Sequence, residues 1–272
     1  MVFKNIVERA ISEHDLAVVA CSFGRDSMVV LHMVMNECKK QGKPFKIIYN
    51  DTMVEYPEQY KYKDRIVKEW GLEDNLIVAK SKDWTFWKVA DTYGMPILPR
   101  DKSNATAMCC ELLKKRPTKL ALKEFVGINY VYFTGLNAYE SSLRYRSAMK
   151  YGNYFFSKSW KHQKCHPIMW WNDEQIDSYI VENNISLCDI YSYDEIEGYI
   201  VRNGCWCCPQ AWNYGKSQWI KNYYPKLYKH LITKTELGDY IISKKLVLDK
   251  GQLSFLDKNN VFDTRPCFFE KF

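Results

Sequence analysis

The chain has 272 residues, of which 47% are hydrophobic and 26% charged, and it shows no low-complexity block or internal repeat, as is typical of a globular protein with a substantial core. No run of about 18 apolar residues is present and residues 1–14 are typical of an amphipathic helix rather than a signal peptide, so a cytoplasmic protein without a membrane partner is expected. The formal net charge of +7 suits a polyanionic partner, although a surface that only maintains solubility would carry the same charge.

Short apolar runs alternate with helical patterns along the first half of the chain. The first run, LAVVAC at residues 16–21, is β-branched and typical of a strand buried on both faces of a parallel sheet. Strands are expected at residues 16–21, 45–49, 76–79 and 129–134, and helices at residues 1–14, 28–40 and 57–70. This alternation predicts an α/β fold with a doubly wound, mostly parallel sheet.

The sequence becomes aromatic, polar and irregular after about residue 160. Helices are expected there near residues 173–183 and 217–235. We therefore expect an α/β domain of residues 1–160 and a C-terminal region of residues 161–272, a helical and irregular extension that carries half of a cysteine cluster.

The segment SFGRDS, residues 22–27, joins the first expected strand to its helix. A helix N-terminus directs backbone N–H groups and the positive end of the helix dipole at one point, where a phosphate binds well. Ser22 and Ser27 add hydroxyl donors, Gly24 permits close approach of the backbone, and Arg25 supplies a cation. Asp26 would cap the helix or orient a metal-bound water. An ordinary helix cap after a strand is the structural alternative.

The segment lacks the Gly-Lys-Ser/Thr ending of a Walker loop, which disfavours kinase or motor ATPase chemistry. SFGRDS resembles the SGGKDS loop of the ATP pyrophosphatase (PP-loop) superfamily, whose members cleave ATP between the α and β phosphates and leave an adenylate. Phe23 stands in place of a glycine, so the backbone there must tolerate a side chain, and Arg25 in place of lysine keeps the charge. The resemblance implies an adenine nucleotide alpha hydrolase-like fold, with ATP and Mg²⁺ bound at residues 22–27.

Two later segments resemble the phosphoadenylyl-sulfate (PAPS) reductase branch of that superfamily. Asn50-Asp51-Thr52, with Glu55 and Pro57-Glu58, is similar to DTG-x-E-F-P-E-T. Because strand-end loops bind ligands in α/β sheets, this resemblance implies that Asp51 and Thr52 contact the adenosine. A solvated turn is the alternative.

The second segment, GLNAYESSLR at residues 135–144, is similar to G-x-R-x-x-E-S-x-x-R and also follows an expected strand. The resemblance implies nucleotide contacts from Gly135 and Glu140, and anion binding by Arg144. Asn137 stands where the family usually has arginine, which removes one phosphate contact. Glu140 and Arg144, four residues apart, could instead form a surface ion pair.

Cysteines cluster at two places, Cys109-Cys110 and CWCCP at residues 205–209. Four soft thiolates suit zinc or an iron–sulfur cluster. A tandem pair is awkward for one tetrahedral zinc ion, whereas a cluster has separate iron corners, so a 4Fe-4S cluster is favoured over zinc. The same pattern resembles cluster-bearing members of the PAPS reductase branch. The expected ligands are Cys109, Cys110, Cys205 and Cys208. Cys207 is either a spare thiol, a sulfur relay or a structural residue.

Reductases of this branch use a C-terminal cysteine in an ECG-x-H context, which Cys267, in RPCFFEKF, lacks. The pattern also resembles DNA phosphorothioation sulfurtransferases of DndC or SspD type. That resemblance implies adenylation of a DNA phosphodiester oxygen, sulfur from a cysteine desulfurase partner, and a homodimer as a candidate assembly. The expected catalytic residues are Arg25, Asp26, Lys114 and Arg144. The alternatives are a PAPS or adenylyl-sulfate reductase, a tRNA thiolation enzyme, and a non-catalytic iron–sulfur module that binds nucleic acid.

Overall fold

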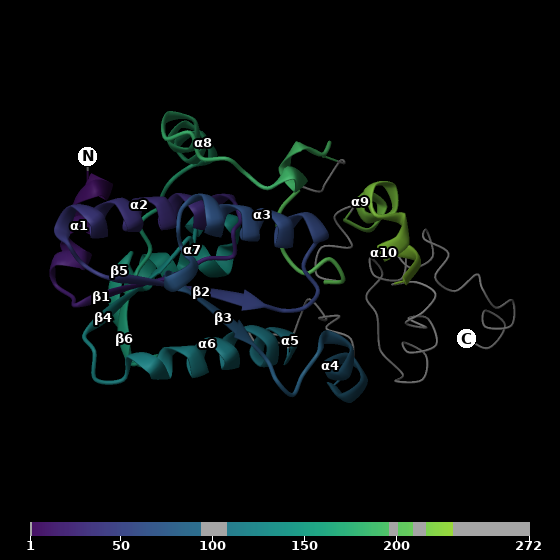
Figure 1. Ribbon diagram of the computed structural model, residues 1–272, viewed down its shortest axis with the longest axis horizontal. Coiled ribbons are helices and arrows are strands. Elements are labelled where there is room, and N and C mark those ends of the chain that lie inside the picture. Colours follow the sequence, from purple (N-terminus) through teal and green to yellow (C-terminus); the bar gives the residue numbers. More distant parts are fainter. Residues whose placement is uncertain (1, 94–107, 196–200, 209–215, 231–272) are drawn as a thin grey trace, which may run out of the picture.

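The computed structural model describes residues 2–93, 108–195, 201–208 and 216–230. Its centre is a six-stranded sheet in the order β3-β2-β1-β4-β6-β5, in which all neighbouring strands are parallel except β5 and β6 (Figure 1). The strands are β1 (Leu16–Ala20), β2 (Phe45–Asp51), β3 (Leu76–Lys80), β4 (Tyr130–Thr134), β5 (Tyr154–Ser157) and β6 (His162–Cys165). The predicted α/β fold with a mostly parallel sheet is confirmed.

Helices cover both faces of this sheet (Figure 1). The longer ones are α1 (Val2–Ser12), α2 (Arg25–Gln41), α3 (Pro57–Glu69), α7 (Ser142–Tyr151) and α8 (Asp173–Glu182). The shorter ones are α4 (Phe86–Tyr93), α5 (Met108–Cys110), α6 (Arg116–Ala121), α9 (Lys216–Tyr223) and α10 (Pro225–Lys229). Single turns are η1 (Glu73–Asn75), the π-helical η2 (Glu111–Lys115), η3 (Leu122–Phe125), η4 (Ala138–Glu140) and η5 (Asp189–Ser192). In the described part of the chain, no helix has both the length and the apolar character that a bilayer crossing requires.

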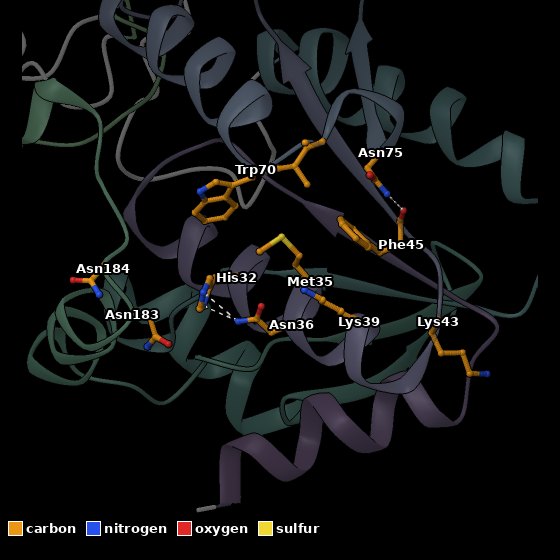
Figure 2. A pocket seen from close by; sticks show the side chains of 12 residues that line it. His32, Met35, Asn36, Lys39, Lys43, Phe45, Trp70, Asn75, Asn183 and Asn184 are labelled. Atoms are coloured by element: carbon orange, nitrogen blue, oxygen red, sulfur yellow. Dashed lines mark hydrogen bonds between the residues drawn. The ribbon is translucent and has the colours of Figure 1, made fainter.

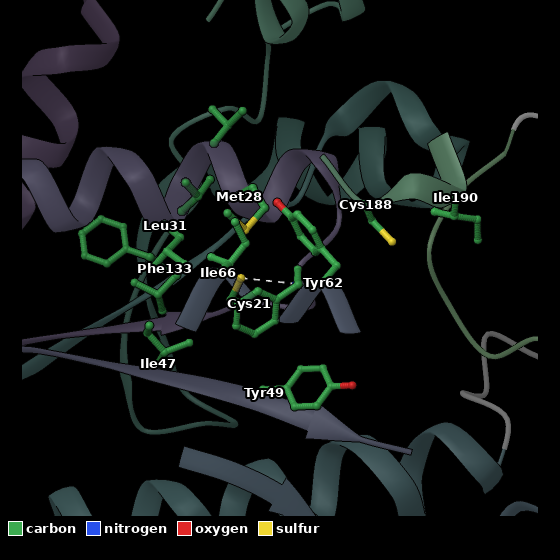
Figure 3. Close-up of a cluster of buried hydrophobic side chains, with 14 of the residues drawn as sticks. Cys21, Met28, Leu31, Ile47, Tyr49, Tyr62, Ile66, Phe133, Cys188 and Ile190 are labelled. Atoms are coloured by element: carbon green, nitrogen blue, oxygen red, sulfur yellow. Dashed lines mark hydrogen bonds between the residues drawn. The ribbon is translucent and has the colours of Figure 1, made fainter. Parts of the chain in front are cut away.

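The apolar run of β1 is buried on both sides, as its composition predicts. Ala17 and Val19 belong to the larger core beneath α1, α2, α3 and α8, whereas Leu16 and Val18 belong to a smaller core beneath α6 and η3. Figure 3 shows part of the larger core, where Met28 and Leu31 of α2 and Ile66 of α3 pack toward the sheet. Burial of these side chains holds the start of α2 against the end of β1.

The strand order reverses beside β1, which places the candidate site. From β1 the chain passes through α2 to β2 on one side, whereas β4 pairs with β1 on the other side. In open parallel sheets ligands bind in the crevice at the carboxyl ends of the two strands that flank such a reversal. Residues 22–27 follow β1 and residues 135–144 follow β4, so both predicted segments lie at this crevice.

Several elements differ from the sequence predictions. The hairpin of β5 and β6 was not expected, because β6 reads HQKC and has no apolar run. The helix predicted at residues 217–235 stops at Tyr223 and restarts at Pro225, which has no N–H to continue the first helix; residues 231–235 lie outside the described part. The sheet includes β6 and so extends past residue 160, where the boundary was expected; the division of roles between the two regions stays a prediction.

Two buried histidines beside β4 predict that acid weakens the fold. His162 Nδ1 lies 3.0 Å from the Tyr130 hydroxyl, and His166 Nδ1 lies 2.7 Å from Thr134 Oγ1. Burial, with Lys164 nearby, lowers the pKa of each imidazole to about 4. Because these values lie below the usual pKa of about 6.5, unfolding takes up protons, so the stabilisation present above pH 6.5 is lost as the pH falls toward 4.

We expect the free energy of unfolding to fall by about 2–4 kcal/mol between pH 7 and pH 5, measured by urea denaturation. The double variant His162→Gln/His166→Gln should lose most of this pH dependence, since neither position then carries an imidazole that unfolding can protonate. If this double variant loses as much stability between pH 7 and pH 5 as the parent does, groups other than these two histidines cause the pH dependence.

Candidate nucleotide and thiol site

The turn between β1 and α2 has the form of an anion site. The Gly24 N–H donates to Ser27 Oγ over 3.1 Å, and the hydroxyls of Ser22 and Ser27 lie 3.2 Å apart. Phe23 has φ of 55°, in the left-handed region that glycine adopts without strain. Its side chain is buried against Tyr49, with ring centroids 5.6 Å apart. Phe23 therefore takes part in the turn through its backbone, while its ring points into the core.

Three side chains from distant segments fix this turn. Gln59 Nε2 donates to the Ser22 carbonyl over 2.6 Å, Asn203 Nδ2 donates to the Phe23 carbonyl over 2.9 Å, and the Arg25 N–H donates to the Tyr191 hydroxyl over 3.1 Å. Among the described residues, the side-chain oxygens of Gln59 and Asn203 are buried without a hydrogen-bond partner. None of the three was predicted, because nothing local in the sequence links them to the turn.

Arg25 is held by acidic side chains of α8. Its Nη1 lies 2.9 Å from Asp173 Oδ1 and its Nη2 lies 2.8 Å from Asp177 Oδ1, and Nη2 also donates to the Asp173 carbonyl over 3.0 Å. The Arg25 side chain is 24% exposed. A phosphate at the turn must therefore share the guanidinium with these carboxylates or displace them.

A second arginine at this crevice is also paired. Arg144 forms an ion pair with Glu140, and Arg202 Nη1 lies 3.6 Å from the same carboxylate. Burial raises the pKa of the nearby Asp26 carboxyl, and the charges of Arg25 and Arg144 oppose that rise. The i,i+4 pair predicted as an alternative does form, and it lies beside the phosphate turn.

Gly135 brings the end of β4 against the start of α2. A Cβ atom at this position would lie 3.0 Å from the backbone carbonyl of Asp26 and from the backbone nitrogen of Ser27. Only glycine allows this approach without a backbone shift. The need for glycine after β4 is thus a packing requirement of the crevice.

We expect Gly135→Ala to destabilise the protein by about 1–3 kcal/mol and to weaken ATP binding, because the added methyl group displaces the start of α2. Urea denaturation and calorimetric titration with ATP would measure both effects. Gly42→Ala is the control. Gly42 has φ of 63° with open space around its Cβ position, so backbone strain should lower the free energy of unfolding of this variant by about 1–2 kcal/mol, while its ATP affinity should stay unchanged. Equal ATP affinity in both variants would contradict this role.

Asp51 is the last residue of β2 and Thr52 follows it, and the two side chains bind different partners. Asp51 Oδ1 accepts from the Met53 N–H over 2.9 Å and from the Tyr60 hydroxyl over 3.0 Å. The buried Thr52 hydroxyl donates to Glu55 Oε1 over 2.6 Å and lies 3.4 Å from Cys205 Sγ. Thr52 therefore lies beside the cysteines, and contact of either residue with adenosine stays a prediction.

The two cysteine segments come together around Lys114. Cys109 and Cys110 end α5 and lead into the π-helical turn η2, an irregularity common at functional sites. Cys205 and Cys208 share a tight turn, in which the Cys208 N–H donates to the Cys205 carbonyl over 3.1 Å. The charges of Cys205, Glu55, Cys110 and Cys208 raise the pKa of the buried Lys114.

Buried charged groups surround these thiols. Burial raises the pKa of Glu55, and Lys114 opposes that shift. The Lys216 ammonium donates to the Cys205 carbonyl over 2.7 Å, and burial lowers its pKa. The Trp206 N–H donates to the Val54 carbonyl over 2.9 Å, which anchors the turn beside the end of β2. Burial raises the pKa of the Cys205 thiol, and the charge of Lys114 opposes that rise.

The assignment of the four thiols to a 4Fe-4S cluster rather than to a zinc ion stays a prediction. Within the described ranges, no three cysteine, histidine or acidic side chains converge tightly enough to enclose one ion. A single zinc ion needs its thiolates about 2.3 Å from one point, whereas a cluster with several iron atoms takes thiolates that are farther apart. Cys207 is fully buried in the larger core, and Cys267 lies outside the described residues.

A separate hollow lies along the C-terminal half of α2. It has a volume of about 540 Å³ and its lining includes His32, Lys39, Trp70 and Asn183. Figure 2 shows the rings of His32 and Trp70 near one another, with centroids 5.9 Å apart. None of the described site residues predicted from sequence lines this hollow.

Comparison with known proteins gives several relatives. The chain is 26% identical over 235 residues to the uncharacterized protein MJ0066 of Methanocaldococcus jannaschii, covering 84% of this chain and 44% of that protein. It is 28% identical over 174 residues to an adenosine 5′-phosphosulfate reductase of Staphylococcus haemolyticus, covering 63% of each. The chain thus spans less than two thirds of these first relatives.

The fold and the family have independent support. A crystal structure of phosphoadenylyl-sulfate reductase from Candida auris superposes with a TM-score of 0.50 at 20% identity, over 71% of this chain and 86% of that one, which supports the shared fold. The model of the phosphoadenosine phosphosulfate reductase domain matches residues 16–211, well over half of the 272 residues. This match includes the turn after β1, the segment after β4 and both cysteine pairs, and the chain therefore belongs to the phosphoadenosine phosphosulfate reductase domain family.

Proposed function

We propose that this chain binds ATP at residues 22–27 and transfers its adenylyl group to an acceptor oxygen, with release of pyrophosphate. The observation that carries the proposal is the turn itself: it joins β1 to the N-terminus of α2 at the strand reversal, and Ser22 and Ser27 present hydroxyls there. Phosphates are stabilised at such a helix N-terminus. Arg25 and Arg144, at the rim, hold carboxylates that a triphosphate can replace.

The residues would share the chemistry as follows. The acceptor oxygen attacks the α-phosphorus, the bond between that phosphorus and the α–β bridging oxygen breaks, and pyrophosphate leaves. Negative charge builds up on the pyrophosphate leaving group. Hydrogen-bond donors and cations that are already in position there lower the activation barrier. Arg25 and Arg144 would neutralise this charge, and Asp26 would help to hold Mg²⁺ with the phosphates.

Cys109, Cys110, Cys205 and Cys208 would hold a 4Fe-4S cluster, which supplies redox or sulfur chemistry when bound. The soft donor set and the two buried lysines support this assignment. Lys114 would stabilise both the thiolates and an anionic substrate beside them. Glu55 and Thr52, hydrogen-bonded to each other, would orient Lys114 and Cys205.

We infer DNA as the acceptor and a cysteine desulfurase as the sulfur source, as in phosphorothioation enzymes of DndC or SspD type. Once a phosphodiester oxygen is adenylated, the outer sulfur of a desulfurase-derived persulfide attacks the diester phosphorus and AMP leaves. A thiol reductant then cleaves the S–S bond, which frees the carrier thiol and leaves the phosphorothioate. The sequence supports this over reduction of an adenylyl sulfate, because Cys267 lacks the glycine and histidine that follow the reductase nucleophile.

The relatives named adenosine 5′-phosphosulfate reductase favour a second candidate, reduction of a sulfonucleotide. Anaerobically purified protein would be given ATP with DNA, a persulfide donor and a thiol reductant in one reaction, and adenylyl sulfate with a thiol reductant in another. The proposal predicts AMP and pyrophosphate from ATP and no sulfite from adenylyl sulfate. Sulfite formation without pyrophosphate release would assign the reductase activity instead.

A further inference from the structure

The helix α7 is poorly covered by the rest of the fold. Of its ten residues, all described, only Ala148 is buried. Leu143 and Met149 are 54% and 66% exposed. At 1.5 Å per residue the helix is about 15 Å long. A surface of this kind points to a partner that covers it.

Three aromatic rings cluster at the start of this helix. The Tyr145 and Trp170 rings lie 5.9 Å apart, and the Tyr139 ring lies 6.4 Å from Tyr145 and 6.2 Å from Trp170. Tyr139 and Tyr145 are 62% and 44% exposed. Exposed aromatic rings offer flat faces on which unpaired bases stack, with little dependence on sequence.

Basic residues lie on the same helix as Tyr145 and in segments beside the phosphate turn. The Lys150 ammonium lies 5.1 Å from the centroid of the Tyr151 ring, at the end of α7. Helix α7 carries Arg144, Arg146 and Lys150 and no acidic residue. Arg146 and Lys150 are exposed and lie one turn apart. Arg144 and Arg202 share Glu140, and Arg202 precedes Asn203, which donates to the Phe23 carbonyl of the phosphate turn. Positive charge therefore runs from α7 to the candidate nucleotide site.

We propose that the aromatic–basic surface of Tyr139, Tyr145, Trp170, Arg146 and Lys150 binds single-stranded DNA and leads its backbone to the phosphate turn. Bases stack on the three rings while phosphates pair with Arg146 and Lys150. This inference rests on the proposed function, since the strand it binds is the DNA acceptor. A second copy of the chain is a poorer occupant, because a twofold contact of α7 with itself would bring like charges together.

The test is fluorescence anisotropy with a labelled oligothymidylate of roughly 16 nucleotides, long enough for one site, without ATP. Tyr139→Ala/Tyr145→Ala should weaken binding about 10- to 100-fold. Arg146→Ala/Lys150→Ala should lower the slope of log affinity against log salt by about 1.4, since each phosphate contact on a single strand contributes about 0.7. The matched controls are Tyr93→Ala, 52% exposed on α4, and Lys61→Ala/Lys68→Ala on α3, which should bind as the parent does.

Equal losses in the control variants, or equal affinity for duplex DNA or for an RNA strand of matching sequence, would overturn the assignment. So would a dimeric parent in sedimentation whose Tyr139→Ala/Tyr145→Ala variant is monomeric, because the surface would then join two copies. All substituted residues are exposed, and thermal unfolding would verify that the variants fold. Since ATP is absent, this binding is measured independently of the proposed function: failure of ATP cleavage leaves the DNA result intact, and failure of DNA binding leaves ATP cleavage intact.

Discussion

Arg25→Ala should lower the rate of AMP and pyrophosphate formation by about 10²- to 10³-fold, the usual loss when a donor that stabilises developing charge is removed. Arg25 is the cation of the phosphate turn, and its guanidinium lies within 3.0 Å of α8 acceptors before a nucleotide binds. Arg25→Lys should recover part of the rate, because lysine restores the charge without the two-pronged geometry. Quenched-flow measurement of pyrophosphate under anaerobic conditions would give these rates.

The α8 carboxylates provide the matched control. In Asp173→Asn/Asp177→Asn the competition for Arg25 is removed, so ATP should bind about 3- to 10-fold more tightly. The effect is limited because these side chains are 85% and 63% exposed, and such pairs contribute about 1 kcal/mol or less. Unchanged pyrophosphate formation in Arg25→Ala would remove Arg25 from the mechanism, and weaker ATP binding in the α8 variant would mean that the carboxylates position Arg25 rather than compete for it.

Cys205→Ser should abolish cluster binding and bleach the brown colour that an iron–sulfur protein shows. Cys205 Sγ lies 3.4 Å from the Thr52 hydroxyl and interacts with Lys114 of the other cysteine segment, so its loss should affect the whole proposed ligand set. Iron and acid-labile sulfide would be measured chemically after anaerobic purification. The parent should contain them in equal amounts, and the variant should contain only background levels of both.

Cys207→Ala, in the same short segment, is the control for that experiment. The Cys207 side chain is fully buried in the larger core, so alanine should keep the iron and cost about 1–2 kcal/mol of stability. A colourless parent with stoichiometric zinc would contradict the cluster, and loss of iron in Cys207→Ala alone would move the ligand set to that thiol.

Local patterns were sufficient to predict the centre of the sheet. The β-branched run of β1 is buried on both faces, and the phosphate turn and Gly135 both follow strands at the strand reversal. The hairpin of β5 and β6 was missed because its residues pair only through the completed sheet. In β6, His162 and Cys165 are buried while the two residues between them are half-exposed, so no apolar run marks the strand.

The site was predictable only where its residues are adjacent in sequence. The turn of residues 22–27 and the cysteine pairs stand out as motifs, and the structure brings both cysteine segments to Lys114. The groups that hold the turn could not be found this way, since Gln59, Tyr191 and Asn203 come from three different segments. The same holds for the ion pairs between Arg25 and α8, because their partners lie about 150 residues apart in the sequence.

The position of the nucleotide is the point on which the proposed chemistry depends. Crystals of the anaerobic protein, soaked with an ATP analogue whose α and β phosphorus atoms are joined by a methylene group, would show it directly. We predict phosphate density against Ser22, Gly24 and Ser27, with Arg25 turned from α8 toward the analogue. An empty turn with the analogue bound in another hollow would contradict the account.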